Sequence, residues 1–107
     1  MFRSTPRSDE IEPQQAHESV RSGAVLVDVR EPGEWAAGHA TGAVHVPLGH
    51  LPNRIAELPA DRELLFLCQS GSRSLLATKI ATQRGRVAKS VRGGTIAWAR
   101  AGLPLER

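Results

Sequence analysis

Two short apolar runs constrain the fold of this 107-residue chain more than any other feature. They are AVLVDV at residues 24–29 and ELLFLC at residues 63–68. Runs of this length, without a polar residue at every second position, indicate strands that are covered on both faces. Two weaker strands are predicted at residues 44–46 and 86–91. The chain is therefore expected to build a sheet that lies between two other layers.

Helical segments are predicted between and after these strands, at residues 11–23, 48–58, 73–85 and 95–102. In the first, Pro13 suits an initial helical position and Gly23 can close the helix. The turn-rich segment 30–43 is expected to be mostly loop, with about one helical turn near Trp35. Strands that alternate with helices favour parallel strands joined by right-handed crossovers. We therefore expect an α/β fold, a three-layer α/β/α sandwich with a mostly parallel central sheet.

Length and composition favour one globular domain. The chain has 40% hydrophobic and 23% charged residues, as globular proteins do and disordered ones do not. We expect residues 1–8 to form a flexible N-terminal tail and residues 9–107 a single domain. The first residues lack the apolar segment of a secretory signal, and no apolar run approaches the roughly 18 residues of a membrane span. A cytoplasmic protein that binds no membrane is the expectation.

The single cysteine and the scattered basic residues argue against two further classes of protein. One cysteine cannot form an internal disulfide, so nothing requires an oxidising compartment. The formal net charge is +3, but aromatic residues make up only 4% of the chain. Base stacking on aromatic side chains, which usually accompanies single-strand binding, therefore has little basis here. We expect no nucleic-acid partner.

Cys68 ends the second apolar run, and the short segment CQSGS leads from it to the helix predicted from Arg73. In open α/β sheets ligands bind outside the carboxyl ends of the strands, so Cys68 lies where a site is expected. Gly71 permits backbone angles closed to other residues, so the loop can turn amide N–H groups inward as an anion-binding nest. These amides and Arg73 would lower the pKa of Cys68 and activate its thiolate as a nucleophile. The alternative is a small buried side chain that ends a core strand.

Three segments, in order along the chain, resemble the rhodanese-like sulfurtransferase domains. They are LVDVREPGEWAAGHATGAVHVPL (26–48), CQSGSRS (68–74) and VRGGTIAWARAGLPLE (91–106). The resemblance implies a single-domain rhodanese fold and an enzyme in which Cys68 takes a sulfane sulfur from a small anionic donor such as thiosulfate. Cys68 would hold the sulfur as a persulfide and pass it to a thiol or to cyanide.

The same resemblance implies the binding residues and the partners. The substrate would bind to the loop formed by Gln69, Ser70, Gly71, Ser72 and Arg73. No cofactor is implied, and a sulfur-relay protein is a further candidate partner. Two positions depart from the family pattern. His45 stands where asparagine is common, which leaves one local hydrogen bond open, and Gln69 stands where some active members carry a basic residue, which favours weaker thiosulfate capture.

Two other functions use this scaffold or a similar cysteine loop. A non-catalytic rhodanese-like module would bind a partner, or deliver sulfur only when docked. An arsenate reductase, or a phosphatase of the related cell-cycle type, also uses a loop cysteine. Four residues separate Cys68 from Arg73, one fewer than in cysteine phosphatases as a class, whose arginine would fall at Ser74. The shorter loop closes a smaller ring of amides, which suits a single sulfur atom better than a phosphoryl group.

Charged residues near the first strand are expected to have structural roles. Asp28 and Arg30 follow one another closely at the end of that strand, where a charged pair more often supports the loops than acts as a base. Glu34 and Trp35 are expected to cap and pack the helical turn. Trp98, on the last helix, is expected to anchor the core.

Histidines raise two further types of site. A Cys–His dyad needs a histidine beside Cys68, and nothing in the sequence places one there. Metal ligation needs side chains at short spacings, whereas His39, His45 and His50 lie in different segments. We expect no metal site.

Overall fold

The computed structural model describes residues 9–107, and its centre is a five-stranded sheet in the order β1-β6-β5-β2-β4. Every neighbouring pair in this sheet is parallel. The strands are β1 (Glu10–Ile11), β2 (Val25–Asp28), β4 (Val44–His45), β5 (Leu64–Leu67) and β6 (Ala88–Val91). The tail expected at residues 1–8 lies outside the described residues.

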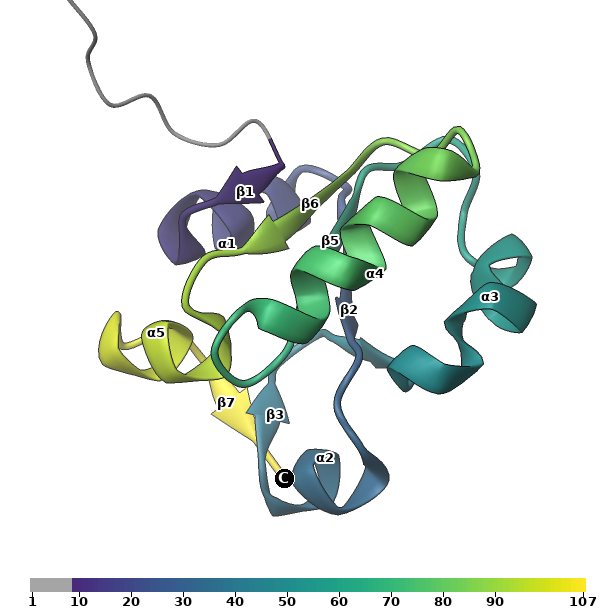
Figure 1. Ribbon diagram of the computed structural model, residues 1–107. Coiled ribbons are helices and arrows are strands. Elements are labelled where there is room, and N and C mark those ends of the chain that lie inside the picture. The colour runs from purple at the N-terminus through teal and green to yellow at the C-terminus, as the bar shows by residue number, and fades with distance from the viewer. Residues whose placement is uncertain (1–8) are drawn as a thin grey trace, which may run out of the picture.

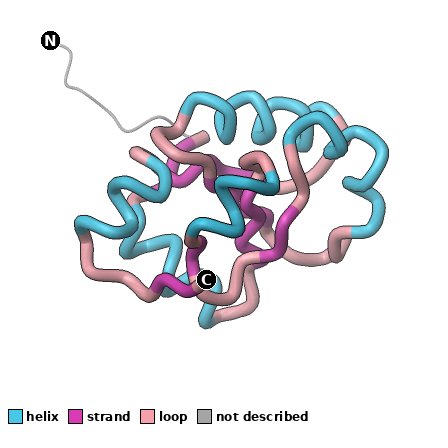
Figure 2. The backbone as a smooth tube through the Cα atoms, turned by 90° about the horizontal axis from the view of Figure 1, so that it is seen from below, coloured by secondary structure: helices cyan, strands magenta, loops and turns pink. Residues whose placement is uncertain are grey.

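Helices cover both faces of this sheet (Figure 1). One layer contains α1 (Pro13–Arg21) and α5 (Gly94–Arg100), and the other contains α3 (Leu51–Arg54) and α4 (Ser72–Gln83). Short 3-10 turns flank α3 at Leu48–His50 and Ile55–Glu57. Figure 2 shows the strands lying between the helices. The predicted three-layer α/β sandwich is therefore confirmed.

Alternation along β5 divides the core into two clusters. Leu64 and Phe66 belong to the cluster under α3 and α4, whereas Leu65 and Leu67 belong to the cluster under α1 and α5. This is the period of two that a strand covered on both faces imposes. Cys68 continues the first series, so its side chain lies on the α4 face.

Segment 30–43 is more regular than the predicted loop. It contains α2 (Pro32–Ala37), which begins with a proline and a capping box between Glu31 and Glu34. It also contains β3 (His39–Ala40), which pairs antiparallel with β7 (Leu105–Glu106). Neither these two strands nor β1 was predicted, because a strand of two residues shows no hydrophobic periodicity.

Candidate active site

Cys68 is the first residue after β5, at the carboxyl end of the central part of the sheet. Its residue surface is 1% exposed. The loop that follows turns into α4 at Gly71, which has a φ of 114° and caps the helix N-terminus. This left-handed conformation is the reason that glycine is needed at this position. The loop therefore brings the Gly71 amide back to the cysteine side chain.

Polar groups of Gly71 and Ser74 lie close to the Cys68 sulfur. The backbone amide of Gly71 donates a hydrogen bond to Sγ at 3.1 Å, and the amide of Ser74 donates one at 3.4 Å. The Ser74 hydroxyl oxygen lies 3.4 Å from Sγ. Donors that converge on one sulfur at the start of a helix form a small anion-binding nest.

The pKa of Cys68 is lowered from its ordinary value, although the side chain is buried. Burial is the largest single influence and acts to raise the pKa, because a low-dielectric surrounding disfavours the thiolate. The Ser74 hydroxyl and the amides of Ser74, Gly71 and Ser70 act in the opposite direction and together outweigh burial. Hydrogen bonds to the charged sulfur therefore make the thiolate accessible, and no neighbouring histidine is needed.

The start of α5 holds the cysteine loop from the other side (Figure 1). The amide of Thr95 donates to the carbonyl of Cys68 at 2.8 Å, and the amide of Ile96 donates to the carbonyl of Gln69 at 3.2 Å. The preceding turn allows this close approach, because Gly94 has a φ of 62° and a Cβ atom there would overlap the carbonyl oxygens of Gln69 and Cys68. The Gly93–Gly94 turn therefore lies directly beside the cysteine loop.

Arg73 pairs with Glu34 rather than with the sulfur. Its Nη1 donates to Oε1 of Glu34 at 2.7 Å and its Nη2 donates to Oε2 at 2.9 Å. The Arg73 hydrogen bond holds the pKa of Glu34 at about 2, well below the ordinary 4.5. Glu34 was predicted to cap the helical turn and does so in the capping box with Glu31, but its pairing with the cysteine loop was not predicted.

Removing this ion pair should change how stability depends on pH. A carboxylate whose pKa is lowered by folding stabilises the protein above pH 4.5, and loses that effect as the pH falls toward about 2. We expect Glu34→Gln to cost about 1 kcal/mol at pH 7, a modest value because solvent screens this partly exposed pair. The difference between variant and wild type should shrink steadily in urea denaturation series from pH 5 to pH 3.

Glu57→Gln is the matched control for that measurement. It removes the exposed pair that Glu57 makes with Arg54 at 3.2 Å on one helical turn. Its expected cost is smaller, a few tenths of a kcal/mol. A Glu34→Gln difference that stays constant over the same pH range would contradict the assigned role of the Arg73 pair.

Asp28 and Arg30 form a buried ion pair next to the loop. The carboxylate of Asp28 accepts hydrogen bonds from the backbone amide of Arg30 at 2.9 Å and from its Nη2 at 2.8 Å. The same Nη2 donates to the carbonyl of Gly38, just after α2, at 2.7 Å. The pair therefore joins the end of β2 to the far end of the helix that carries Glu34.

The side chains of the predicted binding loop lie at its surface. Gln69, Ser70 and Ser72 are exposed, whereas Gly71 is buried and Arg73 is half-buried. A cleft of about 420 Å³ lies beside them, lined by Arg30, Glu34, Ala37, Gly38, Gln69, Thr95, Ile96 and Ala99. Of the predicted loop residues, Gln69 is the one that faces this cleft.

Two histidines stack on Trp35 instead of approaching the cysteine. The ring of His39 is stacked at a centroid distance of 3.5 Å and that of His45 at 4.8 Å. His45 Nε2 lies 2.7 Å from the carbonyl oxygen of Arg30, which resolves the hydrogen bond left open by the sequence. Within residues 9–107, no group of three or more metal-binding side chains is placed to hold an ion. In the same residues, no helix is both long and apolar enough to cross a membrane.

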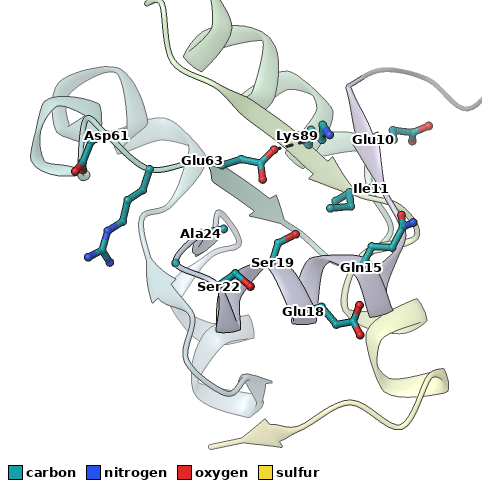
Figure 3. Close-up of a pocket in the computed structure, with 12 residues that line it drawn as sticks. Glu10, Ile11, Gln15, Glu18, Ser19, Ser22, Ala24, Asp61, Glu63 and Lys89 are labelled. Atoms are coloured by element: carbon teal, nitrogen blue, oxygen red, sulfur yellow. Dashed lines mark ion pairs between the residues drawn. The ribbon is translucent and has the colours of Figure 1, made fainter.

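A second pocket lies at the opposite end of the sheet (Figure 3). Its volume is about 870 Å³, and it is lined by residues that precede β2 and β5, such as Ala24 and Glu63. Glu63 reaches toward Lys89 across it, with Nζ and Oε2 3.8 Å apart. Because parallel α/β sheets bind ligands at the carboxyl ends of their strands, the Cys68 end is the candidate site.

Comparison with known proteins agrees with this geometry. The family model described as Rhodanese-like domain matches residues 12–101. The chain belongs to the rhodanese-like domain family. It is 45% identical over 83 residues to a sulfurtransferase of Allochromatium vinosum, across 76% of this chain and 77% of that protein. It is 37% identical over 75 residues to the thiosulfate sulfurtransferase GlpE of Stutzerimonas stutzeri, across 70% and 69% of the two proteins.

The fold of this rhodanese-like domain also matches solved structures. The crystal structure of a rhodanese-related protein from Thermoplasma volcanium aligns with a TM-score of 0.84 and 27% sequence identity. The alignment covers 91% of this chain and 96% of that chain. The fold predicted from the three matching segments is therefore confirmed.

Sequence reasoning missed two serines of this rhodanese-like domain. Ser74 and Ser90 are both fully buried, and their hydroxyl oxygens lie 2.7 Å apart beside Cys68. A signal for Ser90 was present, since a polar residue in a strand covered on both faces needs a hydrogen-bonding partner. Ser74 lies three residues after Gly71, where the first turn of α4 brings it back over the loop.

Proposed function

We propose that this protein is a sulfurtransferase that accepts a sulfane sulfur on Cys68 and transfers it to a thiol or to cyanide. The main support is the nest around Sγ, in which the amides of Gly71 and Ser74 donate to the sulfur and the Ser74 hydroxyl oxygen lies 3.4 Å from it. The relatives named as sulfurtransferases support the same chemistry. A thiolate stabilised in this way is a nucleophile without a general base.

The proposed reaction has two balanced steps. In the first, the Cys68 thiolate attacks the outer sulfur of thiosulfate, a new S–S bond forms, and the old S–S bond breaks with its electron pair leaving on sulfite. In the second, an acceptor thiolate or cyanide attacks the outer sulfur of the Cys68 persulfide. That step returns the Cys68 thiolate and releases a new persulfide or thiocyanate. A sulfur-relay protein that carries such a thiol is the proposed protein partner.

The loop from Gln69 to Arg73 is proposed to bind the incoming donor mainly through its backbone. Nearby charges cancel, because Arg73 pairs with Glu34 and Arg30 pairs with Asp28. Gln69, which lines the adjacent cleft, adds no charge. A dianion that approaches a thiolate is repelled unless cations compensate. We therefore expect thiosulfate to be a usable donor with a high KM.

Asp28 and Arg30 are proposed to support the loop and to take no part in proton transfer. Asp28 holds the guanidinium of Arg30, which donates to the carbonyl of Gly38 and so fixes α2, whose Glu34 pairs with Arg73. The chain of contacts runs from the end of β2 to the cysteine loop without passing through Sγ. Asp28 is thus a structural partner of the loop in this proposal.

Intact-mass spectrometry after incubation with thiosulfate tests the proposed function. We expect a gain of one sulfur atom per chain, which cyanide or dithiothreitol removes, with thiocyanate formed in the cyanide reaction. The same preparation should leave an aryl phosphate unhydrolysed. Robust phosphate release without thiocyanate would favour the phosphatase alternative, and a folded protein inactive in both assays would favour a binding module.

A further inference from the structure

A pair of buried hydroxyls connects β6 to the cysteine. Ser90 on β6 is in register with Phe66 on β5, so both side chains point to the α4 face on which Cys68 also lies. Ser90 Oγ lies 2.7 Å from Ser74 Oγ, and Ser74 Oγ lies 3.4 Å from Cys68 Sγ. Ser74 and Ser90 are both 0% exposed. The contacts from Ser90 Oγ through Ser74 Oγ to Cys68 Sγ are therefore made without a bridging water molecule.

The Ser74 hydroxyl has one proton and more than one acceptor. Its oxygen is 3.0 Å from the carbonyl oxygen of Gly71 and 3.4 Å from Sγ. When Cys68 is a thiol, its S–H can donate to Ser74 Oγ while the Ser74 proton goes to Gly71. When Cys68 is a thiolate, the charged sulfur is the stronger acceptor and attracts the Ser74 proton. The hydroxyl therefore responds to the charge on Sγ.

Ser90 determines how strongly the Ser74 hydroxyl can donate its proton to the Cys68 thiolate. If the Ser74 proton points at Sγ, the 2.7 Å contact between the two hydroxyls must use the proton of Ser90. A hydroxyl that accepts a hydrogen bond becomes a stronger donor, so the Ser90 bond polarises Ser74 toward the thiolate. The Ser90 hydroxyl also donates to a lone pair of the Ser74 oxygen that would otherwise have no hydrogen-bond donor inside the core.

We propose that Ser90 is a positioning residue for Cys68: it donates to Ser74 Oγ and thereby directs the single Ser74 hydroxyl proton at the thiolate. Ser90 itself touches neither the sulfur nor the donor. The inference depends on the proposed function only for its effect on sulfur transfer, because the ionisation of Cys68 is measurable without any donor.

Other charged groups face this site and stay unchanged when Ser90 is replaced. They come from α4, from α2 and from the end of β2: Arg73, Glu34, Asp28 and Arg30. Arg73 pairs with Glu34 and Arg30 pairs with Asp28, whereas Arg92, the residue after β6, is exposed and pairs with Glu12 at 3.3 Å. A shift caused by removal of the Ser90 hydroxyl is therefore separable from a change in these ion pairs.

The test is the pKa of Cys68 in Ser90→Ala, measured from the ultraviolet absorbance of the thiolate. The chain has one cysteine and no tyrosine, so no tyrosinate signal overlaps the titration. We expect the pKa to rise by about half a unit, which is roughly a threefold loss of thiolate below the pKa. The acidic limb of the sulfur-loading rate should move upward by the same amount, with the rate at high pH unchanged.

Thr78→Ala is the matched control. Thr78 is a buried hydroxyl on the same helix, and it donates to the backbone carbonyl of Ser74 at 2.8 Å. Its removal perturbs α4 and the core without breaking the hydroxyl row, so the pKa of Cys68 should stay at the wild-type value. An equal shift in Thr78→Ala would overturn the proposal, because it would show that any loosening of the helix has this effect.

A double-mutant cycle shows whether Ser90 acts through Ser74. In a Ser74→Ala background the further change Ser90→Ala should leave the pKa where Ser74→Ala puts it. An unchanged pKa in Ser90→Ala alone, or the same shift in both backgrounds, would overturn the inference. Ser90→Val removes the same hydroxyl and suits a strand if the alanine variant does not fold. A wild type that shows the pKa pattern but no sulfur loading would reject the proposed function while retaining this role.

Discussion

Cys68→Ser is expected to lose sulfur loading altogether. A serine hydroxyl is far less acidic than a thiol, and the described site offers no base close enough to activate it. The donors that stabilise the thiolate, the amides of Gly71 and Ser74, remain in place but have no charged sulfur to bind. We expect loading from thiosulfate to fall below detection, at least roughly three orders of magnitude under the wild-type rate. Intact-mass spectrometry with a time course measures this directly.

The fold of the Cys68→Ser variant should persist, because a serine side chain is only slightly smaller than that of cysteine. Its hydroxyl would also lie beside the same hydrogen-bond donors. A melting curve and circular dichroism serve as the control. Sulfur that still adds to the folded Cys68→Ser protein would show that another group carries it. That result would remove Cys68 from the proposed reaction.

Gly94→Ala is expected to have the largest effect of any substitution outside the cysteine. The added Cβ would overlap the carbonyl oxygens of Gln69 and Cys68, and alanine would have to adopt a φ of 62°. Strain and overpacking together should cost roughly 2–4 kcal/mol. Relief of the overlap must push α5 away from the loop, so the hydrogen bonds from Thr95 and Ile96 should weaken and loading should slow.

Gly85→Ala separates the backbone strain from the overlap. Gly85 has a φ of 80°, and a Cβ there would meet no atom within 4 Å. It lies past the other end of α4, so its expected cost is about 1–2 kcal/mol, with loading unchanged. Urea denaturation and the loading assay compare the two variants. Equal stability losses, with normal loading in both, would contradict the close packing of α5 on the loop.

The elements with strong local patterns could be predicted from the sequence. The continuous apolar runs at 24–29 and 63–68 identified β2 and β5, and the position of Cys68 after the second run placed it at the carboxyl end of the sheet. Gly71 was predicted to need an unusual backbone conformation, and it has one. In each case the signal lies within a few neighbouring residues, which is where propensity and periodicity act.

The contacts that complete the site could not be predicted in this way. Glu34 and Arg73 are 39 residues apart, and Ser74 and Ser90 are 16 apart. Which residues meet over such distances depends on how α2 and β6 pack, and the sequence pattern carries no direct information on that. Arg73 illustrates the problem: its position in the loop suggested a contact with the thiolate, whereas tertiary packing gave it a carboxylate partner.

The surroundings of Cys68 are assembled from segments that join at different times when the chain folds. The Gly71 and Ser74 contacts close once β5 and the first turn of α4 meet, whereas Ser90 and Thr95 arrive from 16 to 27 residues away. Closing longer loops costs more chain entropy, so the distant groups should dock later. Because the chain has one cysteine, the rate at which a reagent labels the Cys68 thiol during refolding reports the order in which these contacts form, without an engineered probe. The accessibility of the Cys68 thiol over time therefore reports how far the assembly of the domain has progressed.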